Sequence, residues 1–420
     1  GHDRLAGGEA SAANLVTLDV TTTDSDYITS ADTRLPFLIR VRSGGDQPFA
    51  GKLTATLHDY ETRQEVDRTE LPLTAPAGGS AGAVLPLGRE QAGWYDAKLQ
   101  LTGQCGGQAI NLTKEFTIGV DPAKAVPPLY RPADLKEFWA KTLQELAARP
   151  MNARLTPMES LSTDRAAVYK LQLQGLVDEP FFAWYVHPKK PGKHPATLLV
   201  PGYGDHGIGN PRGLAEAGIC AVSIQVRHTD VDLPKYEGKP YMTLGIDSPE
   251  TYVYRDIYCM GVRAIDFLLS RPEVDPEKVM VQGMSQGGGL SIATAALDPR
   301  VKLAAAEVPF LCDYPEALKV ASYPYGEIRN YLNEHPERRE QVLRTLSYFD
   351  GMNLAPEIRC PVVMTVGLRD RVCPPPTVWA AYHYITAPKQ IFVYPAMGHA
   401  VSSEFGQARE QWARTLMPLP

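Results

Sequence analysis

Short runs of alternating apolar and polar residues, separated by turn-forming residues, occupy the chain from about residue 14 to residue 120. In residues 52–57 every second position is apolar, which is the pattern of a strand that buries one face. Runs of this type cover residues 15–20, 35–41, 53–57, 94–101 and 110–118, and glycine pairs at 78–79 and 106–107 supply turns. This spacing is typical of antiparallel sandwiches, so we predict an immunoglobulin-like β-sandwich domain over residues 1–120.

The N-terminal region contains no catalytic pattern. Carbohydrate binding or attachment is one interpretation of it, and a structural spacer or dimerisation module is an equally good one. A proline-rich segment follows at residues 121–132. Because proline fixes φ and lacks the N–H that would join a sheet, we predict a semi-rigid linker and a domain boundary here.

After this linker the pattern changes to strands that alternate with helices. An amphipathic helix is predicted at residues 133–148, where the apolar residues form one stripe. Strands are predicted at residues 168–173, 181–187, 196–200, 221–226, 279–281, 303–308, 362–366 and 391–394. Helices are predicted at residues 252–270, 288–296, 376–384 and at the end of the chain. Such alternation implies right-handed crossovers, so residues 133–420 are predicted to form an α/β domain whose mostly parallel sheet is covered on both faces.

Length and charge narrow the function. The 420 residues exceed what one hydrophobic core usually organises, which agrees with two domains. A formal net charge of -6 gives no positive field that would gather nucleic acid or an anionic membrane surface, so neither is expected as a partner. The longest apolar runs are far shorter than the roughly 20 residues that span a bilayer. The six cysteines have no paired spacing, which favours buried free thiols.

The decisive segment is a G-x-S-x-G sequence at residues 283–287, between a predicted strand and a helix of small residues. In this context the serine occupies a sharp, strained turn, where side chains at Gly283 or Gly287 would collide with the neighbouring strand and helix. The turn lifts the Ser285 hydroxyl above the sheet at a helix N-terminus, where developing negative charge is favoured. We therefore predict that Ser285 is a catalytic nucleophile.

A serine hydroxyl is a poor nucleophile until a base removes its proton, so a histidine and an orienting acid must follow. In α/β-hydrolases they follow in the order acid, then histidine. Asp370 lies just after the strand predicted at 362–366, and His399 lies on the loop after the last predicted strand. Because open α/β sheets place functional groups at the carboxyl ends of strands, we predict Asp370 as the acid and His399 as the base. Asp350 is the nearest rival acid, but it follows a helical stretch.

The tetrahedral intermediate of acyl transfer also needs backbone N–H donors aimed at its oxyanion. One donor is predicted to be the amide of Gln286, the residue after the nucleophile. The other is predicted to be the amide of Tyr203, in the loop at residues 201–204 that follows an early strand. An ordinary glycine turn is the alternative interpretation of this loop.

With these residues identified, the chain from about residue 132 to its end resembles the acetyl xylan esterase and cephalosporin-C deacetylase family of carbohydrate esterases. Four matching stretches are Y-V-Y-R-D at 252–256, G-M-S-Q-G-G-G at 283–289, V-P-F-L-C at 308–312 and T-L-S-Y-F-D at 345–350. A fifth covers residues 367–378, where G-L at 367–368, Asp370, P-P at 374–375 and T-V at 377–378 match. The resemblance implies an α/β-hydrolase fold and the removal of acetyl groups from carbohydrate esters. It also implies the triad Ser285, Asp370 and His399, oxyanion donors at Tyr203 and Gln286, and no metal or other cofactor.

The resemblance further implies an acetyl-sized pocket that Pro309 and Phe310 help to wall, although both residues would also suit a hydrophobic core. The chain departs from the family at Arg227-His228-Thr229, where arginine, glycine and glutamine are usual near the pocket. Arg227 is retained as a candidate substrate-binding residue. A glutamate often follows the catalytic histidine in the family, and this chain has alanine there.

Many plain family members form hexameric rings without a β-sandwich, so a homo-oligomer is an assembly to be tested. The residues at 1–4 have none of the charged, apolar and small-residue regions of a signal peptide. A sandwich module joined to a polysaccharide esterase nevertheless suits work outside the cytoplasm. We expect a periplasmic or secreted enzyme whose export signal is not within this sequence.

Several alternatives stay open at this point. An esterase for another carbohydrate acyl or methyl ester, or a peptidase of similar fold, is the alternative within enzymes. A non-catalytic carbohydrate-binding protein on a hydrolase fold is the alternative from another class, and the intact triad argues against it. A metal site formed by His206, His228, Asp205 and Asp230 is disfavoured, because their irregular spacing suits polar loops better.

Overall fold

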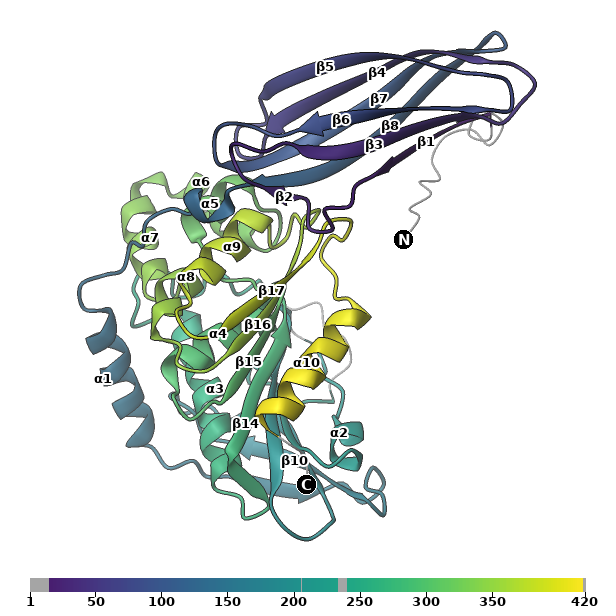
Figure 1. The fold of residues 1–420 in the computed structure, drawn as a ribbon. Coiled ribbons are helices and arrows are strands. Elements are labelled where there is room, and N and C mark those ends of the chain that lie inside the picture. The colour runs from purple at the N-terminus through teal and green to yellow at the C-terminus, as the bar shows by residue number, and fades with distance from the viewer. Residues whose placement is uncertain (1–14, 205, 233–239, 418–420) are drawn as a thin grey trace. The chain divides into compact units, whose positions relative to one another are not determined.

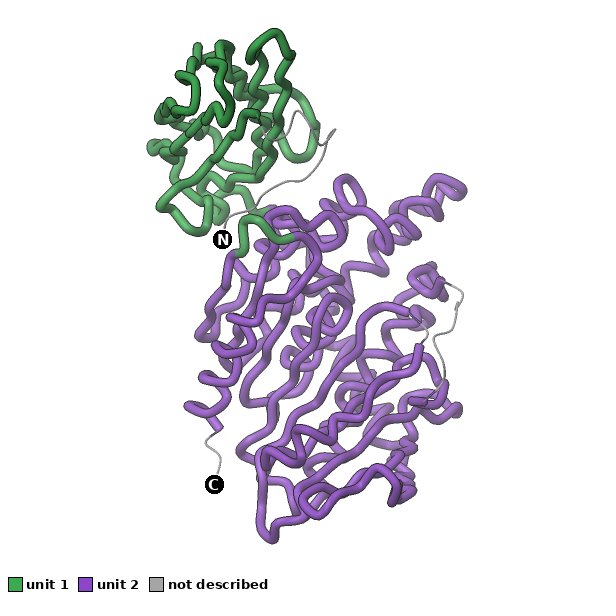
Figure 2. The backbone as a smooth tube through the Cα atoms, turned by 90° about the vertical axis from the view of Figure 1, so that its right-hand side faces the viewer, with its two compact units in different colours: residues 1–126, 394–397 green, residues 127–393, 398–420 purple. Residues whose placement is uncertain are grey.

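The computed structural model describes residues 15–204, 206–232 and 240–417 (Figure 1). The chain forms two compact units, of which the first comprises residues 1–126 and 394–397 and the second comprises residues 127–393 and 398–420 (Figure 2). The division therefore falls within the proline-rich segment, which also contains a short 3-10 helix, η1 (Pro122–Lys124). In the described part of the chain, every helix is too short or too polar to cross a membrane.

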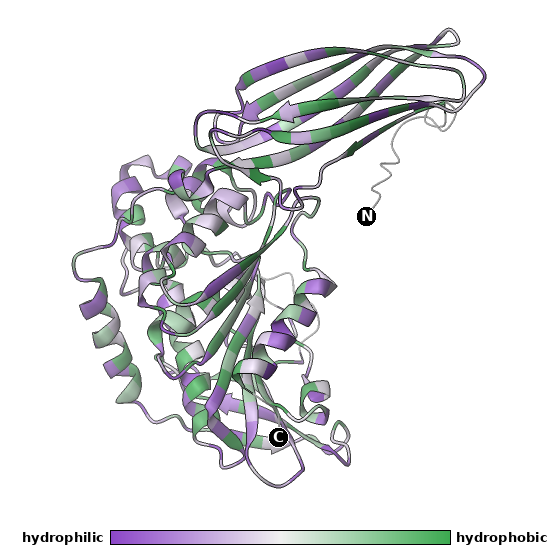
Figure 3. Ribbon diagram, viewed as in Figure 1, coloured by the Kyte–Doolittle hydropathy of each residue, from purple (hydrophilic) through white to green (hydrophobic). Residues whose placement is uncertain are grey.

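The first unit is a β-sandwich. One sheet has the strand order β1-β3-β6 and the other has the order β2-β8-β7-β4-β5. The strands are β1 (Val16–Thr21), β2 (Ile28–Thr29), β3 (Leu35–Ser43), β4 (Phe49–Asp59), β5 (Glu65–Ala75), β6 (Ser80–Leu87), β7 (Gly93–Cys105) and β8 (Gln108–Val120). Buried and exposed residues alternate without a break along β3, and the hydropathy colours change in bands along the strands (Figure 3). The buried face of each sheet therefore supplies the core of this unit.

Strands β5 and β6 lie outside the predicted runs. Both are edge strands, which have a hydrogen-bonded neighbour on one side only. Most of β5 is exposed and polar, and β6 is made largely of small residues. Their weak hydrophobic alternation therefore follows from their place at the sheet edge.

Among the described residues, the second unit contains a sheet of nine strands in the order β17-β16-β15-β14-β12-β13-β11-β10-β9. Its strands are β9 (Arg154–Pro157), β10 (Ala166–Leu173), β11 (Phe181–Pro188), β12 (His194–Val200), β13 (Cys220–Ile224), β14 (Val274–Met284), β15 (Leu303–Glu307), β16 (Val362–Gly367) and β17 (Lys389–Tyr394). Strands β13, β12, β14, β15 and β16 pair in parallel, whereas β9, β10 and β11 add antiparallel pairs at one end. The predicted α/β-hydrolase fold with a mostly parallel sheet is confirmed.

Helices cover both faces of this sheet, with α2 and α10 on one side and α3, α4 and α9 on the other (Figure 1). The helices are α1 (Leu135–Ala147), α2 (Arg212–Glu216), α3 (Val253–Leu269), α4 (Gln286–Leu297), α5 (Tyr314–Val320), α6 (Tyr325–Glu334), α7 (Arg339–Ser347), α8 (Gly351–Leu354), α9 (Pro375–Tyr384) and α10 (Ser403–Leu416). Helices α5 to α8 form an insertion between β15 and β16, of which the sequence pattern indicated only the helical stretch before Asp350. The parallel strands β12, β14, β15 and β16 all end at one edge, and their following loops carry the candidate site.

Candidate active site

Ser285 is the single residue between the end of β14 and the start of α4, and its backbone is strained. Its φ of 61° and ψ of -117° lie in a region that residues with side chains rarely adopt. A Cβ at Gly283 would come within 2.7 Å of Gly287, and one at Gly287 would come within 2.4 Å of the Val200 carbonyl oxygen. The two glycines of the motif are therefore required by close backbone approach.

Neighbouring loops hold this turn in place. The Ser285 N–H donates to the carbonyl of Glu307 at the end of β15 (2.9 Å). The Ser285 carbonyl accepts from the N–H of Phe310 (2.9 Å) and from that of Gly289 (3.1 Å). A strained conformation persists when the surrounding structure fixes it in this way, and such strain concentrates at functional sites.

Asp370 and His399 form a hydrogen-bonded pair. Asp370 Oδ2 lies 2.9 Å from His399 Nδ1, and its other oxygen accepts from the N–H groups of Val372 (2.8 Å) and Cys373 (2.9 Å). The carboxylate is fully buried, whereas the His399 side chain is 25% exposed. When the Nδ1–H group of His399 donates to Asp370, the Nε2 atom carries no proton and can act as a base.

Cys373 lies beside all three predicted triad residues. Its thiol, a carboxylate oxygen of Asp370 and an imidazole nitrogen of His399 lie within 4.8 Å of one another. Burial raises the pKa of this thiol well above its usual range and the charge of Asp370 adds to the effect, whereas a hydrogen bond with the Ser285 side chain opposes it. The thiol therefore stays protonated and does not compete as a nucleophile. The loop after Asp370 gave no sign of this contact in the sequence.

The structure thus places Ser285, Asp370 and His399 each beside the Cys373 thiol. In the described part of the chain, no hydrogen bond joins the Ser285 hydroxyl to the His399 imidazole. Catalytic hydrogen bonds often become short and well aligned only when substrate is bound.

Asp350, the rival acid, holds two backbone segments together. Its carboxylate is fully buried and accepts from the N–H groups of Asp313 (2.7 Å), Tyr314 (2.9 Å) and Met352 (2.8 Å). The Tyr130 hydroxyl is a further donor. These bonds fix the start of α8 and the loop before α5, and none of them involves a histidine.

The two predicted oxyanion donors are connected through the side chain of Gln286. As the first residue of α4, Gln286 lies where helix N–H groups have no partner within the helix. Its buried side-chain amide donates to the carbonyls of Gly202 (3.1 Å) and Pro201 (3.4 Å), the residues just before Tyr203. Its side-chain oxygen accepts from the hydroxyls of Tyr254 (2.7 Å) and Tyr241 (3.2 Å). One side chain therefore fixes the separation of the two predicted donors.

Tyr241 extends this network over the loop. Its hydroxyl also accepts from the N–H of Gly204 (3.1 Å), and its ring stacks on the Tyr203 ring with centroids 4.3 Å apart. The Tyr203 hydroxyl donates to Glu327 (2.7 Å) and accepts from the Tyr241 N–H (2.9 Å). The sequence did not predict these tyrosine roles, because the residues come from segments far apart along the chain.

The remaining predicted residues surround this network. The Arg227 guanidinium lies over the Tyr241 ring, 4.3 Å from its centroid. Pro309 and Phe310 are buried in the loop after β15, and the Phe310 ring packs against Tyr325 with centroids 4.3 Å apart. Phe310 also supports the Ser285 turn through its backbone.

Three of the residues considered as metal ligands bind other groups. His206 Nδ1 contacts the Gly207 carbonyl, His228 pairs with Asp256, and Asp230 pairs with Lys170. Asp205 lies outside the described residues.

The His228–Asp256 pair predicts a pH-dependent contribution to stability. His228 Nε2 lies 2.7 Å from Asp256 and Nδ1 lies 3.0 Å from the Pro180 carbonyl, so both nitrogens face acceptors. Burial alone lowers the pKa of His228, but the hydrogen bond and charge of Asp256 outweigh it, and the net shift is upward from 6.5. A raised folded-state pKa stabilises the protein fully below the unfolded pKa, and this stabilisation is lost as pH rises through the folded-state pKa.

His228→Asn removes the titrating ring and suits the left-handed backbone at this position, where φ is 60°. We expect the difference in unfolding free energy between native protein and variant to be larger at about pH 5.5 than at about pH 8.5, as measured by denaturant titration. Asp256→Asn should remove the same pH dependence. A difference that stays constant with pH would contradict the assignment.

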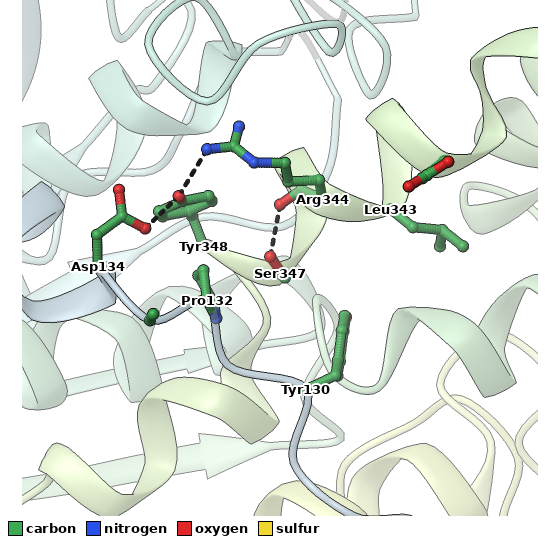
Figure 4. Close-up of a pocket in the computed structure, with 9 residues that line it drawn as sticks. Tyr130, Pro132, Asp134, Leu343, Arg344, Ser347 and Tyr348 are labelled. Carbon is green, nitrogen blue, oxygen red and sulfur yellow. Dashed lines mark hydrogen bonds between the residues drawn. The ribbon is translucent and has the colours of Figure 1, made fainter.

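A shallow cavity of about 420 Å³ lies away from these residues, between the segment at 130–134 and helix α7 (Figure 4). Several of its polar groups bond to one another. The Tyr348 hydroxyl donates to Asp134, Arg344 donates to the Tyr348 hydroxyl (3.0 Å), and Ser347 donates to the Arg344 carbonyl. The triad residues do not line this cavity, and we assign it no role in the chemistry.

The chain is similar to several known proteins. The acetyl xylan esterase (AXE1) family model matches residues 124–416. An acetyl esterase of Xylanibacter ruminicola is 30% identical over 349 residues, which cover 79% of this chain and 76% of that protein. The solved acetyl xylan esterases of a Paenibacillus species (35% identity, TM-score 0.65) and a Thermoanaerobacterium species (33% identity, TM-score 0.66) each cover 70% of this chain, over 98% of their own length. The matched range contains Ser285, Asp370 and His399.

Proposed function

Because this chain belongs to the acetyl xylan esterase family and is a carbohydrate acetyl esterase, we propose that it deacetylates xylan or xylo-oligosaccharides through an acyl-enzyme on Ser285. The family inferred from sequence motifs is confirmed. The observation that carries the catalytic proposal is the strained Ser285 turn, together with the hydrogen bond between the buried Asp370 carboxylate and the partly exposed His399.

In the first half-reaction, His399 accepts the Ser285 proton at Nε2 while the serine oxygen bonds to the acetyl carbonyl carbon. Negative charge moves onto the carbonyl oxygen, where the N–H groups of Gln286 and Tyr203 stabilise it. The bond to the sugar oxygen then breaks, and the protonated His399 gives its proton to the departing hydroxyl. The products of this step are a free sugar alcohol and an acetyl ester of Ser285.

In the second half-reaction, water replaces the sugar alcohol. His399 takes a proton from water as its oxygen attacks the acetyl carbon, and the same two N–H groups stabilise the second oxyanion. Return of that proton to the Ser285 oxygen releases acetic acid. Throughout, buried Asp370 keeps the histidine in one tautomer and stabilises its protonated form.

A substrate panel tests this proposal. We expect release of acetate from acetylated xylo-oligosaccharides, and much slower reaction with methylesterified pectin and with a peptide amide. In a series of 4-nitrophenyl esters from acetyl to octanoyl, kcat/KM should be highest at the short end, since each methylene is worth about 1 to 3 kcal/mol in a fitted pocket. A maximum at octanoyl, or faster cleavage of pectin than of the acetylated oligosaccharide, would contradict the proposal that acetyl is the natural acyl group.

We also propose that the enzyme acts in the periplasm or outside the cell, because an intact acetylated polysaccharide does not cross a membrane. Fractionation of the native host with an antibody against this chain tests the location. Recovery in the cytoplasmic fraction alone would contradict it.

A further inference from the structure

Tyr323 is unusual among the aromatic residues of this protein. In the described part of the chain it is the one Phe, Tyr or Trp that is classed as exposed, at 61% of its surface. Scattered aliphatic residues on a surface are ordinary. A large aromatic ring in water is less so, because burying such a ring contributes substantially to stability or binding.

The backbone at Tyr323 is anchored to the loop that carries the predicted catalytic acid. The N–H and the hydroxyl of Ser322 both donate to the carbonyl of Arg371, at 2.9 and 3.0 Å. Arg371 directly follows Asp370 in the chain. The residue before Tyr323 is therefore bonded to the residue after the predicted catalytic acid.

The Tyr323 ring contacts the predicted oxyanion loop. Its ring lies edge-on to the Tyr203 ring, with centroids 5.9 Å apart and an interplanar angle of 79°. Tyr203 is fixed by its hydroxyl bond to Glu327 and by stacking on Tyr241. Tyr323 thus lies between the loop after β12, which carries Tyr203, and the loop after β16, which carries Asp370.

An ester that reacts at Ser285 must place its acyl carbon between these loops, and its sugar must extend outward past them. A pyranose ring has a face of C–H groups that packs on an aromatic ring, while its hydroxyl groups stay in water. Tyrosine suits this task because its ring is apolar and its hydroxyl is polar. We propose that Tyr323 forms a sugar-binding subsite, on which a xylose unit of the acetylated substrate packs during deacetylation.

This inference rests on the proposed function, and its test compares two acetyl esters that differ in the alcohol. Acetylated xylo-oligosaccharide carries the sugar, whereas ethyl acetate presents neither a sugar nor any ring. For Tyr323→Ala and Tyr323→Leu we expect kcat/KM on the oligosaccharide to fall about tenfold, which corresponds to about 1.4 kcal/mol, mainly through a higher KM, because the sugar loses the ring on which it packs. Activity on ethyl acetate should stay within about twofold by the same reasoning.

Tyr323→Phe and Tyr323→Trp keep a flat ring and should retain most of the activity on the oligosaccharide. Val177→Ala is a matched control, because Val177 is also an exposed apolar residue (38%) but lies between β10 and β11. We expect this variant to keep the native kcat/KM on both esters. Equal losses on both esters, or full activity of Tyr323→Ala on the oligosaccharide, would overturn the subsite. Native enzyme that cleaves ethyl acetate but not the oligosaccharide would overturn the proposed function itself, and the subsite with it.

Discussion

Ser285→Ala is expected to lower kcat for 4-nitrophenyl acetate by about 10⁴- to 10⁶-fold, the range typical for loss of a triad nucleophile. The variant retains the oxyanion donors and the His399 base but has no oxygen that can form the acyl-enzyme. Its fold should persist, because the turn at residue 285 is held by backbone bonds to Glu307, Gly289 and Phe310 that alanine also makes. Initial rates and thermal unfolding curves measure the two effects separately.

Ser291→Ala provides the matched control. Ser291 lies on α4, the helix that follows Ser285, is buried, and uses its hydroxyl to donate to the Gly287 carbonyl (2.7 Å). We expect this variant to keep kcat within a few-fold and to react with a fluorophosphonate probe as the native enzyme does. Labelling of the Ser285→Ala protein at the native rate would place the nucleophile elsewhere.

The strength of local signals explains how much of the fold was predictable. The parallel strands of the second unit are buried on both faces, so each appears as a continuous apolar run between turn residues. Edge strands β5 and β6 bury little, and helices α5 and α8 are only seven and four residues long, so their periodicity is weak. Antiparallel pairing of β10 with β11 is set by a short connection, which a strand pattern does not reveal.

A similar distinction applies to the site. Ser285, Asp370 and His399 were selected because the fold places such groups just after strand ends, where order along the chain carries information. The contacts of Cys373, Tyr241 and the Gln286 side chain depend on which segments meet in space. A single sequence does not encode that proximity in any local pattern.

Asp370→Asn is expected to lower kcat by about 10⁴-fold while the fold is retained. The Asp370 oxygen that accepts from Val372 and Cys373 has its counterpart in the asparagine carbonyl, so the local turn keeps its bonds. The new NH₂ group then faces His399 Nδ1 and donates to it. This places the imidazole proton on Nε2, where a base for Ser285 is needed, and leaves the protonated ring without its counter-charge.

Asp350→Asn separates this effect from general damage to a buried acid. All four donors around Asp350 point at carboxylate oxygens, so an NH₂ group there opposes at least one of them. We expect its free energy of unfolding to fall by about 1 to 3 kcal/mol for each buried group left unpaired, with kcat of the folded enzyme within a few-fold of native. Denaturant titration should therefore show the larger loss of unfolding free energy in Asp350→Asn, and initial rates should show the larger loss of kcat in Asp370→Asn. Loss of kcat in Asp350→Asn together with normal rates in Asp370→Asn would identify residue 350 as the catalytic acid. Only replacement of the true acid is expected to lower the kcat of enzyme that is still folded.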